Sequence, residues 1–233
     1  MFGFFKKRIK NYCVGEIILF GKYPQKNGED CSPIEWRILD ISEDIALLIS
    51  EYAIIPSGYC NPDEGFKGME WINSLARKVC NNDFYNIAFS EFDKHIICKR
   101  TTEQINISKP TETISCEDNV FILSEDEAVN YMPHLEERRA CPSEYTKTIS
   151  DNVKWCRIDE FIPWWLLPQY EIGGTVTDPS GKTYSGMIYP KAVNQEGEIY
   201  YHGRSVYHAD FAIRPCIQIN LEAYKKLVQP NNA

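Results

Sequence analysis

The chain has 233 residues and no apolar run close to the roughly 20 residues that a membrane-spanning helix needs. It also lacks a basic surplus, because 25 Lys and Arg stand against 33 Asp and Glu, a formal net charge of -8. Nucleic-acid binding requires a basic face, so this balance argues against a nucleic-acid partner. Residues 1–10 place aromatics before cations, the reverse of a secretory signal. We therefore expect a cytoplasmic protein with no membrane partner.

Metal and phosphate motifs are absent too. The nine cysteines stand singly in sequence, with no Cys-x-x-Cys pair or close Cys/His cluster. Buried, reduced thiols are expected rather than a zinc or redox site. The acidic stretches 125–127 and 159–160 lack the alternating oxygen ligands of a calcium loop. No glycine-rich phosphate loop occurs. We expect no metal and no cofactor.

What is present is enough apolar material for a core, with 43% hydrophobic and 13% aromatic residues. The first third carries short apolar or alternating runs at 16–23, 34–41 and 45–50, separated by turn-forming residues. This pattern predicts an antiparallel meander. The polar stretch 24–33 is expected to be a solvated hairpin connection.

From residue 70 on, the spacing of apolar residues changes to that of helices. Within 70–88, the residues Trp71, Leu75 and Val79 recur every four positions, which predicts a helix with these three on one face, and Asn81-Asn82 is expected to mark its end. A second short helix is expected over 90–97, where Ser90 is the predicted N-cap and Asp93 stands three residues later.

The middle of the chain alternates loops and capped helices. The polar, threonine-rich stretch 99–118 is expected to be a loop or an excursion, and 120–123 a buried strand. Ser124 and Glu127 have the spacing of a capping box, which predicts a helix to about Met132. Pro142 is expected to open another helix that carries 144–149.

The last third is rich in aromatics and glycine. The runs 161–168 and 199–207 are expected to form short strands between long loops. Residues 211–221 predict a terminal strand, followed by a tail too polar to pack. Trp36 and Trp71 are expected in the core. Because neighbours in a strand face opposite ways, one of Trp164 and Trp165 is expected to be buried and the other exposed or covered by a loop.

Seven blocks of sequence resemble, in order, those of a bacterial domain family of unknown function. They are FGKYPQ at 20–25, PIEWRILD at 33–40, ALLISEYAI at 46–54, DFYNIAFS at 83–90, NVFILSEDEA at 119–128, WWLLP at 164–168 and AIRPCIQI at 212–219. The resemblance extends from about residue 15 to 221. Several ordered blocks are more specific than any single motif.

The last two blocks resemble those of the C-type-lectin-like fold, in the variant found in formylglycine-generating enzymes and in the target proteins of diversity-generating retroelements. The resemblance implies a single α+β domain over 15–221, with short antiparallel strands, a few helices and long loops. Residues 1–14 would be an N-terminal segment and 222–233 a C-terminal tail. Where the family has Arg-Ser-Pro-Gly after the Trp pair, this chain has Leu166, Leu167, Pro168 and Gln169, so a ligand contact through that Arg would be lost. Fold alone does not assign a function.

The favoured function is a non-catalytic binding module for a protein or peptide. The stretch 194–210 mixes Tyr, Ser, Asn, Arg and His, as recognition loops do. In the resembling retroelement targets the variable ligand-facing residues lie in this stretch. An acidic protein would favour partners with basic patches. The predicted contact surface consists of Tyr200, His202, Arg204, Tyr207 and His208, with Trp165 as an additional anchor.

Two alternatives stay open. An oxidase or hydrolase would draw on the ionisable cluster of His202, Arg204, His208, Asp210 and Arg214, with Cys216 or Ser205 as the nucleophile. An oxidase of the formylglycine-generating type needs paired thiols, whereas Cys141, Cys156 and Cys216 each stand alone in sequence. The other alternative is a prophage- or defence-associated interaction protein, which only the resemblance to retroelement targets supports. The oligomeric state and the ligand are not determined by sequence.

Overall fold

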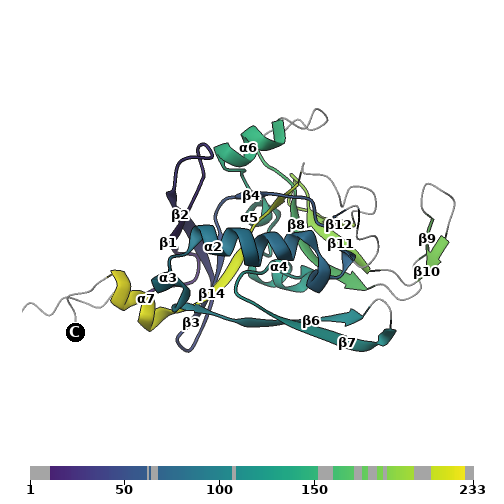
Figure 1. The fold of residues 1–233 in the computed structure, drawn as a ribbon, viewed down its shortest axis with the longest axis horizontal. Coiled ribbons are helices and arrows are strands. Elements are labelled where there is room, and N and C mark those ends of the chain that lie inside the picture. Colours follow the sequence, from purple (N-terminus) through teal and green to yellow (C-terminus); the bar gives the residue numbers. More distant parts are fainter. Residues whose placement is uncertain are drawn as a thin grey trace, which may run out of the picture.

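The computed structural model describes residues 11–61, 63, 68–106, 109–151, 160–170, 175–177, 183–185, 188–201 and 211–228. Over these residues the chain is a mixed α+β fold with mostly antiparallel sheets and a few short helices. Two five-stranded sheets form its main body (Figure 1).

The first sheet contains the predicted meander. Its strand order is β1-β2-β3-β14-β5, and each neighbouring pair is antiparallel. The three N-terminal strands lie within a few residues of their predicted ends, and β3 is buried along nearly its whole length. The strands of this sheet are β1 (Ile17–Tyr23), β2 (Ser32–Ser42), β3 (Ile45–Ser50), β5 (Ile97–Cys98) and β14 (Cys216–Asn220).

The second sheet joins distant parts of the chain. Its order is β12-β11-β8-β13-β4, and the pairing of β13 with β8 is parallel while the others are antiparallel. The single terminal strand predicted over 211–221 is wrong, because Arg214 and Pro215 divide it into one strand for each sheet. The strands are β4 (Ile55–Pro56), β8 (Trp164–Tyr170), β11 (Ile188–Val193), β12 (Ile199–Tyr201) and β13 (Ala212–Ile213).

The helix predicted over 70–88 exists in segments. They are the 3-10 turn η2 (Trp71–Asn73), α1 (Leu75–Lys78), the π-helical η3 (Val79–Phe84) and α2 (Tyr85–Ala88). The expected end at Asn81-Asn82 is wrong, and so is the expected face. Trp71 lies before α1, and the buried positions are Ala76, Cys80, Phe84 and Ala88 instead. Asn81 stays inside the helix because its side chain bonds the chain segment 118–120 rather than its own backbone alone.

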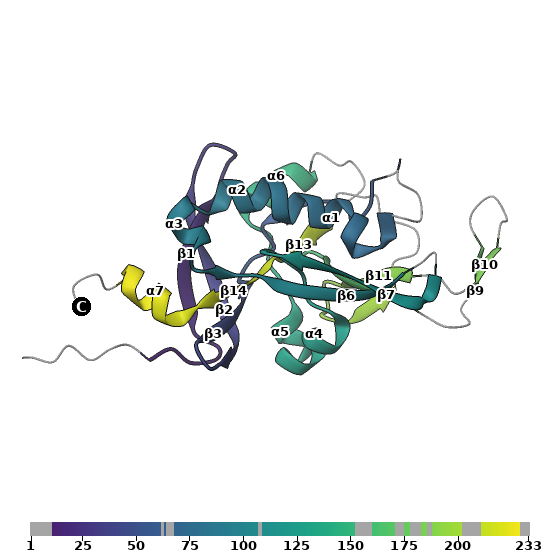
Figure 2. The same ribbon diagram turned by 60° about the horizontal axis from the view of Figure 1, so that its bottom comes forward.

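Of the two alternatives for 99–118, a loop or an excursion, the loop is wrong. This stretch is a two-stranded antiparallel ribbon of β6 (Arg100–Asn106) and β7 (Lys109–Asp118), paired from Arg100 and Asp118 outwards. Its β-branched threonines favour extended backbone, and pairing supplies the hydrogen bonds that a solvated loop would take from water. The ribbon runs beside the segmented helix in both views (Figures 1 and 2). A second ribbon pairs β9 (Thr175–Thr177) with β10 (Thr183–Ser185).

Capping explains the remaining helices. The predicted capping boxes are confirmed at Ser90 with Asp93 and at Ser124 with Glu127. In the helix predicted after Pro142, the Ser143 hydroxyl accepts from the Thr146 N–H at 3.1 Å. The helices are α3 (Glu91–Lys94), α4 (Glu125–Tyr131), α5 (Leu135–Arg138), α6 (Glu144–Asp151) and α7 (Leu221–Val228).

Two further expectations are corrected. Residues 120–123 are fully buried as predicted, but they form one isolated bridge, Phe121 with Cys216, instead of a strand. The C-terminal residues include α7, so the expected unpacked tail, 222–233, is wrong over 222–228. Tyr224 in α7 is buried, and its ring lies 5.9 Å from that of Phe20 and 5.6 Å from that of Tyr12.

The tryptophans fill the core. Trp36 and Trp71 are buried as predicted. Trp164 and Trp165 are both 0% exposed. Of the two alternatives for the second indole, exposure is wrong and coverage by a loop fits, because Trp165 bonds to Ser57 in the loop after β4. Strand β8 lies in the interior of its sheet, and both of its faces are covered: the Trp164 indole N–H donates to the Arg138 carbonyl, and the Trp165 indole N–H to the Ser57 carbonyl. Over the described ranges, no helix has the length and apolar character needed to cross a membrane.

Candidate functional site

Arg214 lies where the chain passes from one large sheet to the other. It follows β13 directly, and Pro215 separates it from β14. Proline has no N–H to give to a sheet ladder, so the strand breaks here and the chain changes sheets. Arg214 is thereby carried into the interior, where it is only 2% exposed. A buried Arg normally has a carboxylate partner.

The guanidinium of Arg214 is held by backbone and ring contacts. Its Nε donates to the Ser50 carbonyl at 2.8 Å and its Nη2 to the Glu51 carbonyl at 3.3 Å. Its Nη1 has the Met132 thioether at 3.7 Å, which is a weak acceptor, and the group lies 5.6 Å from the centre of the Trp164 ring. Among the described residues no carboxylate lies within 4 Å of it. Burial lowers the pKa of Arg214 to about 10, so it stays charged at neutral pH.

A cleft of about 560 Å³ opens above this cation. Its lining includes two further arginines, Arg37 and Arg139, and three glutamates. Glu51 is neutralised locally, because Arg37 Nε donates to its Oε2 at 2.9 Å and Arg37 Nη2 donates to its other oxygen. The aromatic side chains of Tyr52, Tyr131 and Phe161 line the cleft as well. We call this feature the Arg214 cleft. Its full lining is Val14, Gly15, Arg37, Ile38, Leu39, Glu51, Tyr52, Tyr131, Met132, Glu136, Glu137, Arg139, Cys141, Phe161 and Arg214.

The turn between β11 and β12 borders this cleft. Gln195 donates from its side-chain amide to the Phe161 carbonyl at 3.0 Å, and Arg139 Nε donates to the Glu196 carbonyl at 3.3 Å. Within the turn, the Asn194 side-chain oxygen accepts from the N–H of Glu198 at 2.7 Å. The start of the predicted recognition stretch 194–210 is therefore attached to two residues that line the Arg214 cleft.

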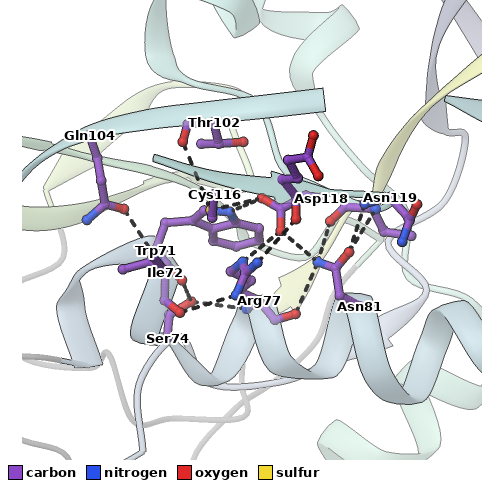
Figure 3. Close-up of polar contacts among 12 residues, drawn as sticks. Trp71, Ile72, Ser74, Arg77, Asn81, Thr102, Gln104, Cys116, Asp118 and Asn119 are labelled. Carbon is purple, nitrogen blue, oxygen red and sulfur yellow. Dashed lines mark hydrogen bonds and ion pairs between the residues drawn. The ribbon is translucent and has the colours of Figure 1, made fainter. Parts of the chain in front are cut away.

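A second polar cluster surrounds Asp118, at the end of β7 (Figure 3). The carboxylate is fully buried and accepts from Arg77 Nε at 2.6 Å and from the Trp71 indole N–H at 2.7 Å. Asn81 donates to it at 3.3 Å, and the Cys116 thiol lies 3.4 Å away. The partners of this carboxylate come from the segmented helix and from β7, so the cluster is best explained as the joint between the ribbon and that helix.

The structure places the predicted site residues unevenly. Trp165 is in the core, stacked on Phe211 at 4.3 Å, and so offers no surface to a partner. Tyr200 is partly buried, with its ring 6.5 Å from that of Phe211. Four predicted contact residues lie outside the described residues: His202, Arg204, Tyr207 and His208.

The cleft itself was missed at the sequence level. The sequence assigns Arg214 only to the ionisable cluster of the enzyme alternative, and it assigns no site role to Tyr52, Tyr131 or Phe161. A usable signal was present, because Arg214 is the one charged residue within the apolar stretch 211–217.

The thiols are not arranged for catalysis where they are described. Cys216, the nucleophile of the enzyme alternative, is 0% exposed, and burial raises its pKa well above the ordinary value for a thiol. Burial also raises the pKa of Cys141 in the cleft and raises that of Cys116 to about 11. The two other groups of the enzyme alternative, His208 and Asp210, lie outside the described residues. No group of three or more metal-ligating side chains occurs in the part of the chain that the structure describes.

With iodoacetamide at mildly alkaline pH, Cys216 is expected to react at least about 100-fold more slowly than the exposed Cys31, because a buried thiol is both unreachable and held in its protonated form. Mass mapping of the modified peptides over time measures both rates. In concentrated urea the two rates should converge. Equal rates in the native protein would restore Cys216 as a candidate nucleophile.

Comparison with known proteins gives a family but no activity. A family model described as "Domain of unknown function (DUF6273)" matches residues 43–221. Neither the curated proteins nor the solved structures contain a match to this chain. The matched range covers most of the 233 residues, so the chain belongs to the DUF6273 family.

Proposed function

We propose that this member of the DUF6273 family is a non-catalytic binding module for a protein or peptide. The observation that carries the proposal is the Arg214 cleft. Its volume of about 560 Å³ lies in the range of ligand sites, and its walls combine tyrosine, phenylalanine and arginine side chains. Aromatic side chains and arginine supply most of the binding energy at protein interfaces.

The proposed contact surface extends from the cleft into the stretch 194–210. The bonds from Gln195 to Phe161 and from Arg139 to Glu196 connect the two regions. The predicted contacts Tyr200, His202, Arg204, Tyr207 and His208 belong to this proposal. Trp165 is withdrawn from it, because its indole is buried and bonded to Ser57.

The chemistry of the cleft supports binding over catalysis. No histidine belongs to its described lining, and Cys141, its one thiol, has a raised pKa. A thiol nucleophile needs a lowered pKa or an adjacent base. Cys141 has neither among the residues that line the cleft.

We extend the proposal to the C-type-lectin-like fold that the sequence blocks resemble. The described block residues lie largely in the interior, as Phe20, Trp36 and Trp164 illustrate. The resemblance therefore concerns residues that build a core and supports a shared fold more than a shared ligand. The relationship to the target proteins of diversity-generating retroelements is likewise a proposal.

The test is an affinity capture from cells that naturally produce the protein. Wild type is compared with a Tyr52→Ala, Tyr131→Ala double variant of the cleft and with a Phe92→Ala control, since Phe92 is an exposed aromatic on α3 outside the cleft lining. Quantitative mass spectrometry and titration of the purified partner should show about tenfold or more loss for the cleft variant and none for the control. A Tyr200→Ala, Arg204→Ala, Tyr207→Ala variant measures the contribution of the second region.

Capture that is equal for wild type and both surface variants would reject the proposed surface. Failure to capture any protein or peptide would reject the binding function. Thermal unfolding of each variant beforehand keeps a folding defect from being read as a lost contact.

A further inference from the structure

The terminal nitrogens of Arg214 contact residues that line the Arg214 cleft, whereas its Nε does not. The Nε edge faces Ser50 in β3, which is not a lining residue. The Nη atoms lie beside Glu51 and Met132, which both line the cleft. The most weakly satisfied edge of the guanidinium is therefore the one beside the cleft, where a thioether is the partner of Nη1.

Among the described residues, no carboxylate forms a direct ion pair with this cation. The charge of Glu51 acts on Arg214, but the Glu51 carboxylate is bonded to Arg37, and Arg214 itself bonds only the Glu51 backbone carbonyl. Removing a guanidinium from water is costly, and backbone carbonyls and a thioether offset the cost only in part. An anionic group in the cleft would complete the ion pair.

The shape of the donor group selects among anions. The planar guanidinium matches a carboxylate, whose two oxygens accept parallel N–H bonds. The rest of the cleft does not resemble a phosphate site, because Glu136 and Glu137 also line it and would repel a doubly charged group. A ligand that places a carboxylate beside Arg214 and a positive charge near these glutamates would match the charges of the described lining.

We propose that the Arg214 cleft binds the C-terminal carboxylate of a basic peptide or protein tail. The carboxylate pairs with Arg214, the last side chains contact Tyr52, Tyr131 and Phe161, and upstream Lys or Arg side chains face Glu136 and Glu137. The net charge of -8 attracts such a basic tail over longer distances. This inference rests on the proposed binding function and names its ligand.

The probe is a fluorescein-labelled pool of hexapeptides built from Lys, Leu and Tyr, prepared with free C-terminal carboxylates. The same pool with amidated C-termini is the matched control, and an amidated pool with one internal Glu tests side-chain carboxylates. Fluorescence polarisation with the wild-type protein should give about tenfold or more tighter binding for the free-acid pool than for either amidated pool.

Two variants locate the effect. Arg214→Met keeps much of the volume and removes the charge, so it should abolish the preference for the free acid over the amide. Arg214→Lys keeps the charge without the planar fork and should retain part of that preference. Because the acid-to-amide ratio is measured within each variant, a general loss of stability does not imitate the expected result.

Equal binding of acid and amide pools to wild type, or no binding of either, would overturn the inference. Equal binding of the free-acid pool and the Glu-containing amide would also overturn it, in favour of internal acidic residues. An acid preference that survives Arg214→Met would place the carboxylate elsewhere. One outcome is that the wild type shows no preference for the free-acid pool while the Tyr52→Ala, Tyr131→Ala variant still loses captured partners. In that case the carboxylate inference fails and the binding function stands. If that loss is missing as well, both fail.

Discussion

Asp118→Asn is expected to lower the free energy of unfolding by about 3–5 kcal/mol, the usual cost of breaking a buried ion pair on one side. The substitution keeps the shape of the side chain but turns one acceptor oxygen into a donor group. Arg77 and the Trp71 indole then compete for a single oxygen, and Arg77 is left without its carboxylate. Urea unfolding followed by tryptophan fluorescence measures the change.

The neighbouring residue supplies a matched control. Glu117 also pairs with a cation, Lys99, at 3.1 Å, but both side chains are largely exposed. Glu117→Gln is therefore expected to cost no more than about 1 kcal/mol, since solvent screens exposed pairs. Equal effects of the two substitutions would show that the Asp118 cluster does not join the ribbon to the helix in the way described.

Gly197→Ala is expected to destabilise the fold by about 3 kcal/mol or more, from a backbone clash added to an unfavourable dihedral angle. Gly197 has a φ of +89°, and a Cβ atom there would lie 2.1 Å from the Leu135 carbonyl oxygen. Its own carbonyl accepts from the buried Arg138 Nε at 2.8 Å. The turn beside the Arg214 cleft would have to move away from α5. Urea unfolding gives the free-energy change.

Gly15→Ala separates the two causes. Gly15 has a φ of +86°, but a Cβ there would meet nothing within 4 Å. Gly15→Ala is therefore expected to lower the free energy of unfolding by the dihedral cost alone, about 1 kcal/mol. A Gly197→Ala variant no less stable than Gly15→Ala would mean that the turn is not seated on α5. Peptide capture by the Gly197 variant should weaken in parallel, because Gln195 and Glu196 bond to residues lining the cleft.

Local signals predicted local structure well. The meander was readable because its apolar runs are bounded by turn residues, and the helices at Ser90 and Ser124 because a capping box involves residues only three positions apart. The threonine-rich stretch 99–118 was misread, because its polar residues resemble a loop until a partner strand is known. Asn81 was misread for a related reason: its hydrogen-bond partners at 118–120 are far away in sequence.

The candidate site was less predictable than the strands. The predicted contact surface centred on 200–208, of which Tyr200 is described, whereas the cleft collects residues from 14 to 214. Tyr52 and Phe161 give no sign in the sequence that they line a common cleft. The Trp164-Trp165 pair shows the same limit, because alternation along a strand left open whether the second indole is exposed or covered by a loop, and only the structure shows that both are buried.

The sequence by itself determined the composition class, the N-terminal strands and the capped helices, because each depends on neighbours a few residues apart. Only the tertiary structure decided that the two halves of the terminal strand join different sheets, that Arg214 is buried without a described carboxylate, and that a cleft opens above it. These features depend on contacts such as Arg214 to Ser50, which lie 164 residues apart, and no local pattern encodes such a pairing.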